Sequence, residues 1–399
     1  MDVNFGTLVV IVLAGLGGPL LAVVGQRYFV PVVVGEVLAG ILVGPAVLGA
    51  VDPTNPSVSA LGEVGFAMLM LTVGMHLPLR DRRLAVSARS GALLALLVCV
   101  LALPAALLAA TIAGGGHAAI YFVVLASGSA AVLLPAFEEL RLEGAEVLTV
   151  MAQVTIADVI TIISVPIVLQ PSRIGHAALG AVFVAAAAAL ALAAARAAEG
   201  HPWLHRVRRL SKQRHWALDL RVSLLMLFVL AWIAQKGGTS VLVAGFGAGV
   251  TIAILGGPKR LSTQMRGVGE GLFIPLYFVV LGARLDLGGL AASPTMLAVT
   301  AALVALNVLI HALATLATRR PLAGALAATA QLGVPAAVAS LGLADDVISS
   351  VTATAIVASA LVSLAVCTLG IEMLARRELA TLALGEPATT AGAAGGAGA

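Results

Sequence analysis

Cysteine, aromatic residues and charge are all scarce in this chain. Among its 399 residues there are 2 cysteines and 3 tryptophans, 4% are aromatic and 11% are charged. Cys99 and Cys367 lie in apolar runs without CxxC or His/Cys spacing, which disfavours a disulfide framework or a thiolate metal site. No basic patch with interleaved aromatics is present, so the net charge of +4 does not indicate nucleic-acid binding.

Apolar residues dominate instead. With 60% hydrophobic residues and a mean hydropathy of +1.08, the composition excludes a soluble enzyme and predicts an all-α polytopic membrane protein. At about 20 apolar residues per crossing, we expect about thirteen transmembrane helices. They begin near residues 5, 29, 60, 91, 118, 146, 175, 220, 239, 268, 293, 322 and 349. The first lacks a basic n-region and a cleavage site, which favours a retained span.

Lysine and arginine alternate between the connections of these spans. Odd-numbered connections hold Arg27, Arg80 to Arg89, Arg141, the cluster Arg196 to Arg221, Lys259 to Arg266, Arg319 with Arg320, and Arg376 with Arg377. Even-numbered connections hold Arg173, Lys236 and Arg284. Because cytoplasmic loops carry most basic residues, we expect an external N-terminus and a cytoplasmic C-terminus in a bacterial inner (plasma) membrane. The basic cluster predicts contact with anionic lipid at the membrane surface.

The two halves of the chain echo each other at an offset of seven helices. Residues 38–40 (LAG) resemble 247–249 (GAG), 74–79 (GMHLPL) resemble 282–287 (GARLDL), and 128–132 (GSAAV) resemble 333–338 (GVPAAV). An odd offset reverses the direction of matched helices, which predicts inverted repeats and alternating access. We expect repeats at 1–174 and 220–375, a linker helix with a basic loop at 175–219, and a disordered cytoplasmic tail at 376–399.

Asp158 is the acid nearest the centre of a long apolar segment, which runs from about Glu146 to Gln170. A charge at mid-bilayer costs at least ~2.5 kcal/mol and usually faces a cavity, an ion path or a proton relay. Helical spacing places Thr155 and Thr161 on the same face. We therefore predict that Asp158 binds a proton or a monovalent cation.

Two other spans contain helix breakers with polar neighbours at mid-depth. The fifth has Ser127, Gly128 and Ser129 followed by Pro135, and the twelfth has Gln331, Gly333 and Pro335. Such gaps are tolerated in a membrane where they are buried in protein or line a watery cavity. Their matching places in the two halves predict a binding site, to which Ser127, Ser129, Thr155 and freed carbonyls contribute ligands.

Three further polar residues are candidates for supporting or gating roles. Glu36 lies about two turns into the second span, where it either gates the cytoplasmic entrance or serves as an interfacial acid. Asn307 and His311 share a face of the eleventh span. They either contact the Asp158 region or make interhelical hydrogen bonds.

These motifs resemble the second branch of the monovalent cation/proton antiporters over nearly the whole chain. Residues 31–36 (PVVVGE) with 39–45 (AGILVGP) look like its second-helix motif, residues 273–278 (FIPLYF) with Gly282 are similar to its tenth, and the Asp158 helix is similar to its sixth. The resemblance implies a homodimer whose core bundle moves against a dimerisation domain, crossed unwound helices in that core, and Asp158 as the ion-binding residue.

The chain departs from the electrogenic members of that family. Those members have a second acid just before the aspartate, where this chain has Ala157. They also have a lysine on the eleventh helix, where the nearest residue of this chain is Asn307 or His311. One carboxylate exchanges one proton for one monovalent cation, so we expect electroneutral 1:1 exchange of Na⁺ or K⁺, with no enzymatic activity and no cofactor. A nucleotide-binding domain after Glu372 is not expected. A coupled carrier of an organic solute or drug and a non-transporting membrane sensor stay open as alternatives.

Overall fold

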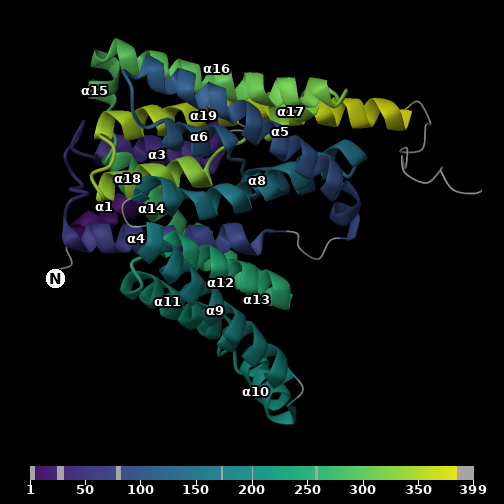
Figure 1. Cartoon of the computed structure of the whole chain (residues 1–399). Helices are drawn as coiled ribbons and strands as arrows, with labels where there is room; N and C mark the ends of the chain where they lie inside the picture. The colour runs from purple at the N-terminus through teal and green to yellow at the C-terminus, as the bar shows by residue number, and fades with distance from the viewer. Residues whose placement is uncertain are drawn as a thin grey trace, which may run out of the picture.

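The computed structural model describes residues 5–24, 31–77, 82–171, 174–199, 201–256 and 259–383, and the regular secondary structure of these residues is helical throughout (Figure 1). Eleven helical segments among them are long and apolar enough to span a membrane. Uninterrupted α-helices supply seven: α4 (Pro56–Met75), α5 (Arg82–Ile112), α8 (Ala145–Leu169), α9 (Ile174–Glu199), α11 (Leu218–Lys236), α16 (Pro294–Ala317) and α19 (Ser350–Ala383).

The other four long segments are interrupted. They comprise α1 (Phe5–Gly15) with α2 (Gly17–Val24), α6 (Ala118–Ala126) with α7 (Ala130–Glu139), α13 (Lys259–Val268) with a π-helical turn (Gly269–Phe273) and α14 (Ile274–Ala283), and α17 (Leu322–Ala328) with α18 (Gly333–Ala344). Two shorter apolar helices, α3 (Val32–Val43) and α12 (Val241–Leu255), lie at the second and ninth expected crossings. The all-helical membrane fold is confirmed, and the count of thirteen stays a prediction that depends on these two.

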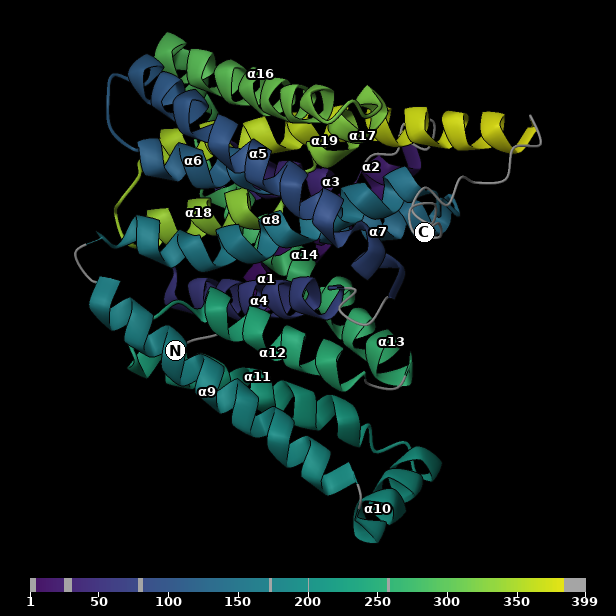
Figure 2. The same ribbon diagram turned by 45° about the vertical axis from the view of Figure 1, so that its right-hand side comes forward.

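The helices form two units. One, here called the core bundle, contains α5 to α8 and α16 to α19, and the other, called the panel, contains α1 to α4 and α9 to α14 with α10 (Pro202–Gln213). Contacts within each unit are extensive, as between α5 and α8 or between α4 and α12, whereas few residues connect the units. In Figure 2, α9, α11 and α12 lie on one side of the molecule, and α5, α16 and α19 lie on the other.

Close helix approaches in the panel follow the sequence echoes. A Cβ on Gly282 of α14 would lie 3.0 Å from the Cα of Gly40 on α3, and a Cβ on Gly249 of α12 would lie 2.8 Å from the Cα of Gly74 on α4. In the sequence echoes, Gly40 corresponds to Gly249 and Gly74 corresponds to Gly282. Exchanging the two halves of the chain therefore converts one of these contacts into the other. Small residues allow membrane helices to approach this closely, and the pairing supports the predicted inverted repeats.

The predicted start of a disordered tail at residue 376 was wrong, because α19 continues to Ala383. Residues 374–383 (LARRELATLA) are mostly strong helix formers. Glu378 Oε1 also accepts a hydrogen bond from the backbone N–H of Glu143 at 3.1 Å, which ties this end of the helix to the core. Residues 384–399 of the predicted tail lie outside the described residues.

Candidate functional site

The fifth expected span is broken at the serines that the sequence singled out. α6 ends at Ala126 and α7 begins at Ala130, and Ser127 and Ser129 between them have extended backbone conformations. Gly128 lies against α8, where an added Cβ would be 2.7 Å from Val154 Cγ1. The break therefore packs directly on the helix that carries Asp158, and glycine permits the close approach.

Asp158 is buried, with 2% of its surface exposed, and faces the start of α7. The backbone N–H of Ala130 donates a hydrogen bond to Asp158 Oδ2 at 2.8 Å. This N–H is one of the donors that a helix N-terminus leaves unpaired, and the helix dipole also favours a negative charge there. Among the described residues, Oδ1 of the carboxylate has no hydrogen-bond donor.

The hydroxyl groups around Asp158 differ in whether they are already paired. Thr155 Oγ1 is buried and has no partner among the described residues. Ser127 Oγ donates to Val124 O at 2.7 Å, and Thr161 Oγ1 donates to Ala157 O at 2.7 Å on its own helix. Ser129 is buried next to Ala130. The uncommitted oxygens on this face of α8 are thus Asp158 Oδ1 and Thr155 Oγ1.

The twelfth expected span is broken between Ala328 and Gly333, beside the first break. Gln331 Nε2 donates to Val124 O at 2.7 Å, so the second break touches the C-terminal end of α6. Asn307 Nδ2 donates to Thr329 O at 3.1 Å and to Ser363 Oγ at 3.1 Å. Two neutral amides therefore bind the carbonyls at the ends of α6 and α17, which carry the negative pole of a helix dipole.

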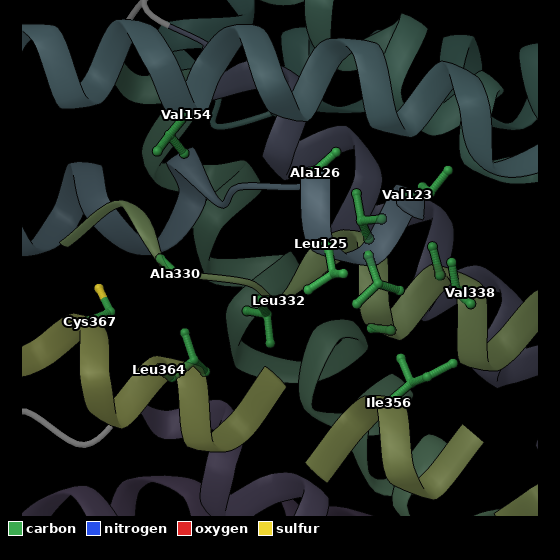
Figure 3. Packing of buried hydrophobic residues seen from close by; sticks show 14 of the residues in the cluster. Val123, Leu125, Ala126, Val154, Ala330, Leu332, Val338, Ile356, Leu364 and Cys367 are labelled. Atoms are coloured by element: carbon green, nitrogen blue, oxygen red, sulfur yellow. The ribbon is translucent and has the colours of Figure 1, made fainter. Parts of the chain in front are cut away.

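Apolar side chains enclose both breaks. Figure 3 shows Leu125, Ala126, Val154, Ala330 and Leu332 around the crossing, with Cys367 of α19 below Ala330. Water is scarce in such surroundings, so an unpaired polar group there costs more than it would at a surface. Loss of any of the few polar contacts at the breaks is therefore costly.

The remaining predicted residues lie at different positions in the structure and make different contacts. Pro335 lies in the first turn of α18, where a missing N–H is harmless. Pro135 lies inside α7, five residues after its start, so it does not make the break. His311 Nδ1 contacts Asn307 O of its own helix at 2.9 Å. Glu36 is buried on α3 in the panel, away from the core bundle that holds Asp158, and its Oε2 has no partner among the described residues.

A cavity of about 360 Å³ lies between the core bundle and the panel. Its polar lining includes Glu63, Gln170, Arg284, Ser340 and Asp345. These residues lie where the predicted topology places the external side. Asp158 does not line the cavity; Pro166 does, and it is eight residues along α8, or about 12 Å at 1.5 Å per residue.

Tyr277 lies where this cavity meets the core bundle, and no role was predicted for it from the sequence. Its ring stacks on Phe66 of α4 with centroids 5.2 Å apart. Its hydroxyl donates to Ala336 O at 3.0 Å and pairs with Ser340 Oγ at 2.9 Å, both on α18. A panel residue is thus hydrogen-bonded to the broken helix of the core.

Replacing Asn307 with leucine should destabilise the protein. The variant removes the side-chain donor to Thr329 O in a dry site, which costs about 1–3 kcal/mol. We expect a lower unfolding temperature in detergent. Ser363→Ala is the matched control, because it leaves the bond from Asn307 to Thr329 in place. Equal unfolding temperatures for Asn307→Leu and wild type would contradict this assignment.

Two broken helices that meet beside a buried carboxylate, in a core bundle loosely joined to a panel, define the architecture of a secondary transporter. The chain belongs to the family of transmembrane sodium/hydrogen exchangers, which matches residues 8–377. It is therefore a multi-pass membrane protein of a transporter family.

Individual relatives agree with this placement. The chain is 22% identical over 285 residues to the Na(+)/H(+)-K(+) antiporter GerN of Bacillus cereus, a match that covers 69% of this chain and 70% of GerN. It is 22% identical over 289 residues to the probable Na(+)/H(+) antiporter GerT of the same organism, covering 72% and 75%. Its fold is similar to that of the sodium proton antiporter MjNhaP1 of Methanocaldococcus jannaschii, with a TM-score of 0.62, 18% identity, and coverage of 97% and 98%.

Proposed function

We propose that the protein exchanges one Na⁺ or K⁺ for one proton, and that both bind at Asp158. The observation that carries this proposal is the carboxylate itself, which is buried, lacks a cationic partner among the described residues and has one oxygen free. Thr155 Oγ1 supplies a second free oxygen, and Ser129 with the carbonyls at the breaks completes the coordination. Oxygen ligands of this kind suit both cations.

Competition for one carboxylate is sufficient for coupling. A proton and a cation cannot both neutralise Asp158, so binding of one releases the other. An ionised, empty Asp158 is costly to move through the apolar shell of the core bundle. Exchange follows if the carrier reorients only when it is loaded, and uncoupled leak is then suppressed.

Reorientation is proposed to occur by an elevator-like movement of the core bundle against the panel. Few residues connect the two units, whereas each is tightly packed internally. The cavity between them ends short of Asp158 in this conformation. Movement of the core bundle would bring the carboxylate to one side and then the other. By resemblance we also propose a homodimer in the plasma membrane, with the N-terminus outside and the C-terminus in the cytoplasm.

The test is proton movement in proteoliposomes that carry a pH gradient, on addition of Na⁺, K⁺ or Li⁺. We expect at least one cation to dissipate the gradient, and a cation that does so is a substrate. The cavity volume also suits a small organic solute. Proton movement in response to an organic cation, but to none of the three ions, would favour a carrier of organic solutes. No response to the ions or to the organic cation would favour a non-transporting sensor.

Tyr277→Phe should raise the rate of exchange. The hydroxyl bonds to Ala336 O and Ser340 Oγ must break when the core bundle leaves this conformation. At about 0.5–1.5 kcal/mol per hydrogen bond, removal of both bonds should speed turnover by about fivefold to 150-fold. Tyr121→Phe is the matched control, because the buried Tyr121 hydroxyl has no partner among the described residues. An unchanged or lower rate in Tyr277→Phe would exclude this role.

A further inference from the structure

The basic connection between α9 and α11 is an amphipathic helix, α10, and not an irregular loop. Helical spacing places Trp203, Val207 and Leu210 on one face and Arg208, Arg209 and Lys212 on the other. Pro202 stands in its first turn, where proline is favoured. The opposition of apolar and basic faces is typical of helices that lie in the membrane interface.

The turn after α10 fixes a second tryptophan beside the helix. The backbone N–H of Trp216 donates a hydrogen bond to the carbonyl oxygen of Ser211 at 3.1 Å, and Ser211 Oγ accepts a hydrogen bond from the backbone N–H of Leu218 at 3.1 Å. The flanking residues His215 and Ala217 have positive φ angles of 57° and 51°, which a tight turn requires. Arg214 lies over the Trp216 ring, 5.8 Å from its centroid.

The apolar side chains of this segment face outward. Trp203 is 68% exposed and Trp216 is 43% exposed. α9, which contains a candidate membrane span, ends at Glu199, and α10 begins at Pro202, so two residues lie between these helices. Figure 2 shows α10 at the far end of α9 and α11, away from the rest of the molecule. Tryptophan is enriched at membrane–water interfaces, where its ring lies at the level of the headgroups.

Most of the positive charge on this segment is unpaired. Arg208 lies 3.4 Å from Asp219, the one carboxylate that the structure pairs with α10 among the described residues. Arg206, Arg209 and Lys212 are exposed and form no ion pair with any residue that the structure describes. The surface therefore has three unpaired cationic side chains beside two exposed tryptophans. This arrangement complements a bilayer surface, in which anionic headgroups lie above an apolar layer.

We propose that α10 and Trp216 form a binding surface for anionic phospholipid in the cytoplasmic leaflet. Trp203 and Trp216 enter the headgroup boundary, and Arg206, Arg209 and Lys212 bind lipid phosphates. Each basic residue near a charged surface strengthens binding on the order of fivefold. Because α10 joins two panel helices, bound lipid would hold the panel at a fixed depth while the core bundle moves.

The test uses tryptophan quenching in the full-length protein. The Trp232→Phe background removes the third tryptophan of the chain, so that emission reports Trp203 and Trp216 alone. The protein is reconstituted in two lipid mixtures of equal composition, with bromine on phosphatidylglycerol in one and on phosphatidylcholine in the other. We expect stronger quenching by brominated phosphatidylglycerol and loss of this preference in Arg206→Gln/Arg209→Gln/Lys212→Gln. Arg376→Gln, at an exposed residue near the end of α19, is the control that should keep it.

Three outcomes would overturn the proposal. They are equal quenching by the two brominated lipids, a preference that survives in the triple variant, and emission that neither lipid quenches. The readout does not depend on ion exchange, so it can fail while the proposed transport stands, and the reverse also holds.

Discussion

Asp158→Asn is expected to abolish cation-driven proton movement while the protein folds normally. The amide has nearly the same shape, and its oxygen can still accept the hydrogen bond from Ala130 N–H. It neither takes up a proton at neutral pH nor carries the charge that balances a cation. Exchange in proteoliposomes should therefore fall to the level of protein-free vesicles, with an unfolding temperature close to that of wild type.

The matched control for this variant is Asp345→Asn. Asp345 lines the cavity and accepts a hydrogen bond from Gln170 Nε2 at 2.6 Å, far from the helix breaks. The same chemical change there should leave most of the exchange activity in place. Sustained wild-type exchange in Asp158→Asn would refute the assignment of the ion site.

Ala130→Pro should weaken the competition of the cation against the proton. Proline at this first position of α7 removes the N–H that binds Asp158 Oδ2 and is otherwise favoured in a helix. Hydrogen bonds to a charged group contribute about 1.5–3 kcal/mol. Their loss disfavours the ionised carboxylate relative to the protonated one. At a fixed pH, the cation concentration for half-maximal exchange should rise by about tenfold to a hundredfold.

Ala130→Gly distinguishes the lost donor from a disturbed helix. Glycine keeps the N–H and adds no atoms to a fully buried position. We expect its half-maximal cation concentration to stay near the wild-type value, measured at the same pH. Equal shifts in the proline and glycine variants would show that the hydrogen bond does not matter.

Much of the fold could be predicted because membrane crossing imposes strong local patterns. Runs of apolar residues located the helices, and the serines near residue 128 located a break that the structure contains. The resemblance between residues 38–40 and 247–249 predicted inverted repeats, and in the structure Gly40 and Gly249 each lie against a glycine of the opposite half. These patterns are local in sequence, so they can be interpreted without knowledge of the tertiary packing.

The parts that escaped prediction depend on contacts between distant segments. The donor to Asp158 is a backbone N–H, which any residue at position 130 except proline would supply, so no residue type marked it. Tyr277 lies in a motif that was noted, but its bond to Ala336 crosses 59 residues of sequence. Gln331 was predicted to have a supporting or gating role, but its bond to Val124 O crosses 207 residues of sequence. Pro135 was expected at a break, although a membrane helix also accommodates an interior proline.

An imposed membrane potential distinguishes electroneutral from electrogenic exchange of the cation that dissipates the pH gradient in proteoliposomes. Vesicles are prepared with cation and proton gradients of equal ratio and the same direction, so that a 1:1 exchanger is at equilibrium. With a single carboxylate at the site, we predict no net cation flux at any imposed potential. Flux that appears with the potential and reverses with its sign would contradict the one-carboxylate mechanism.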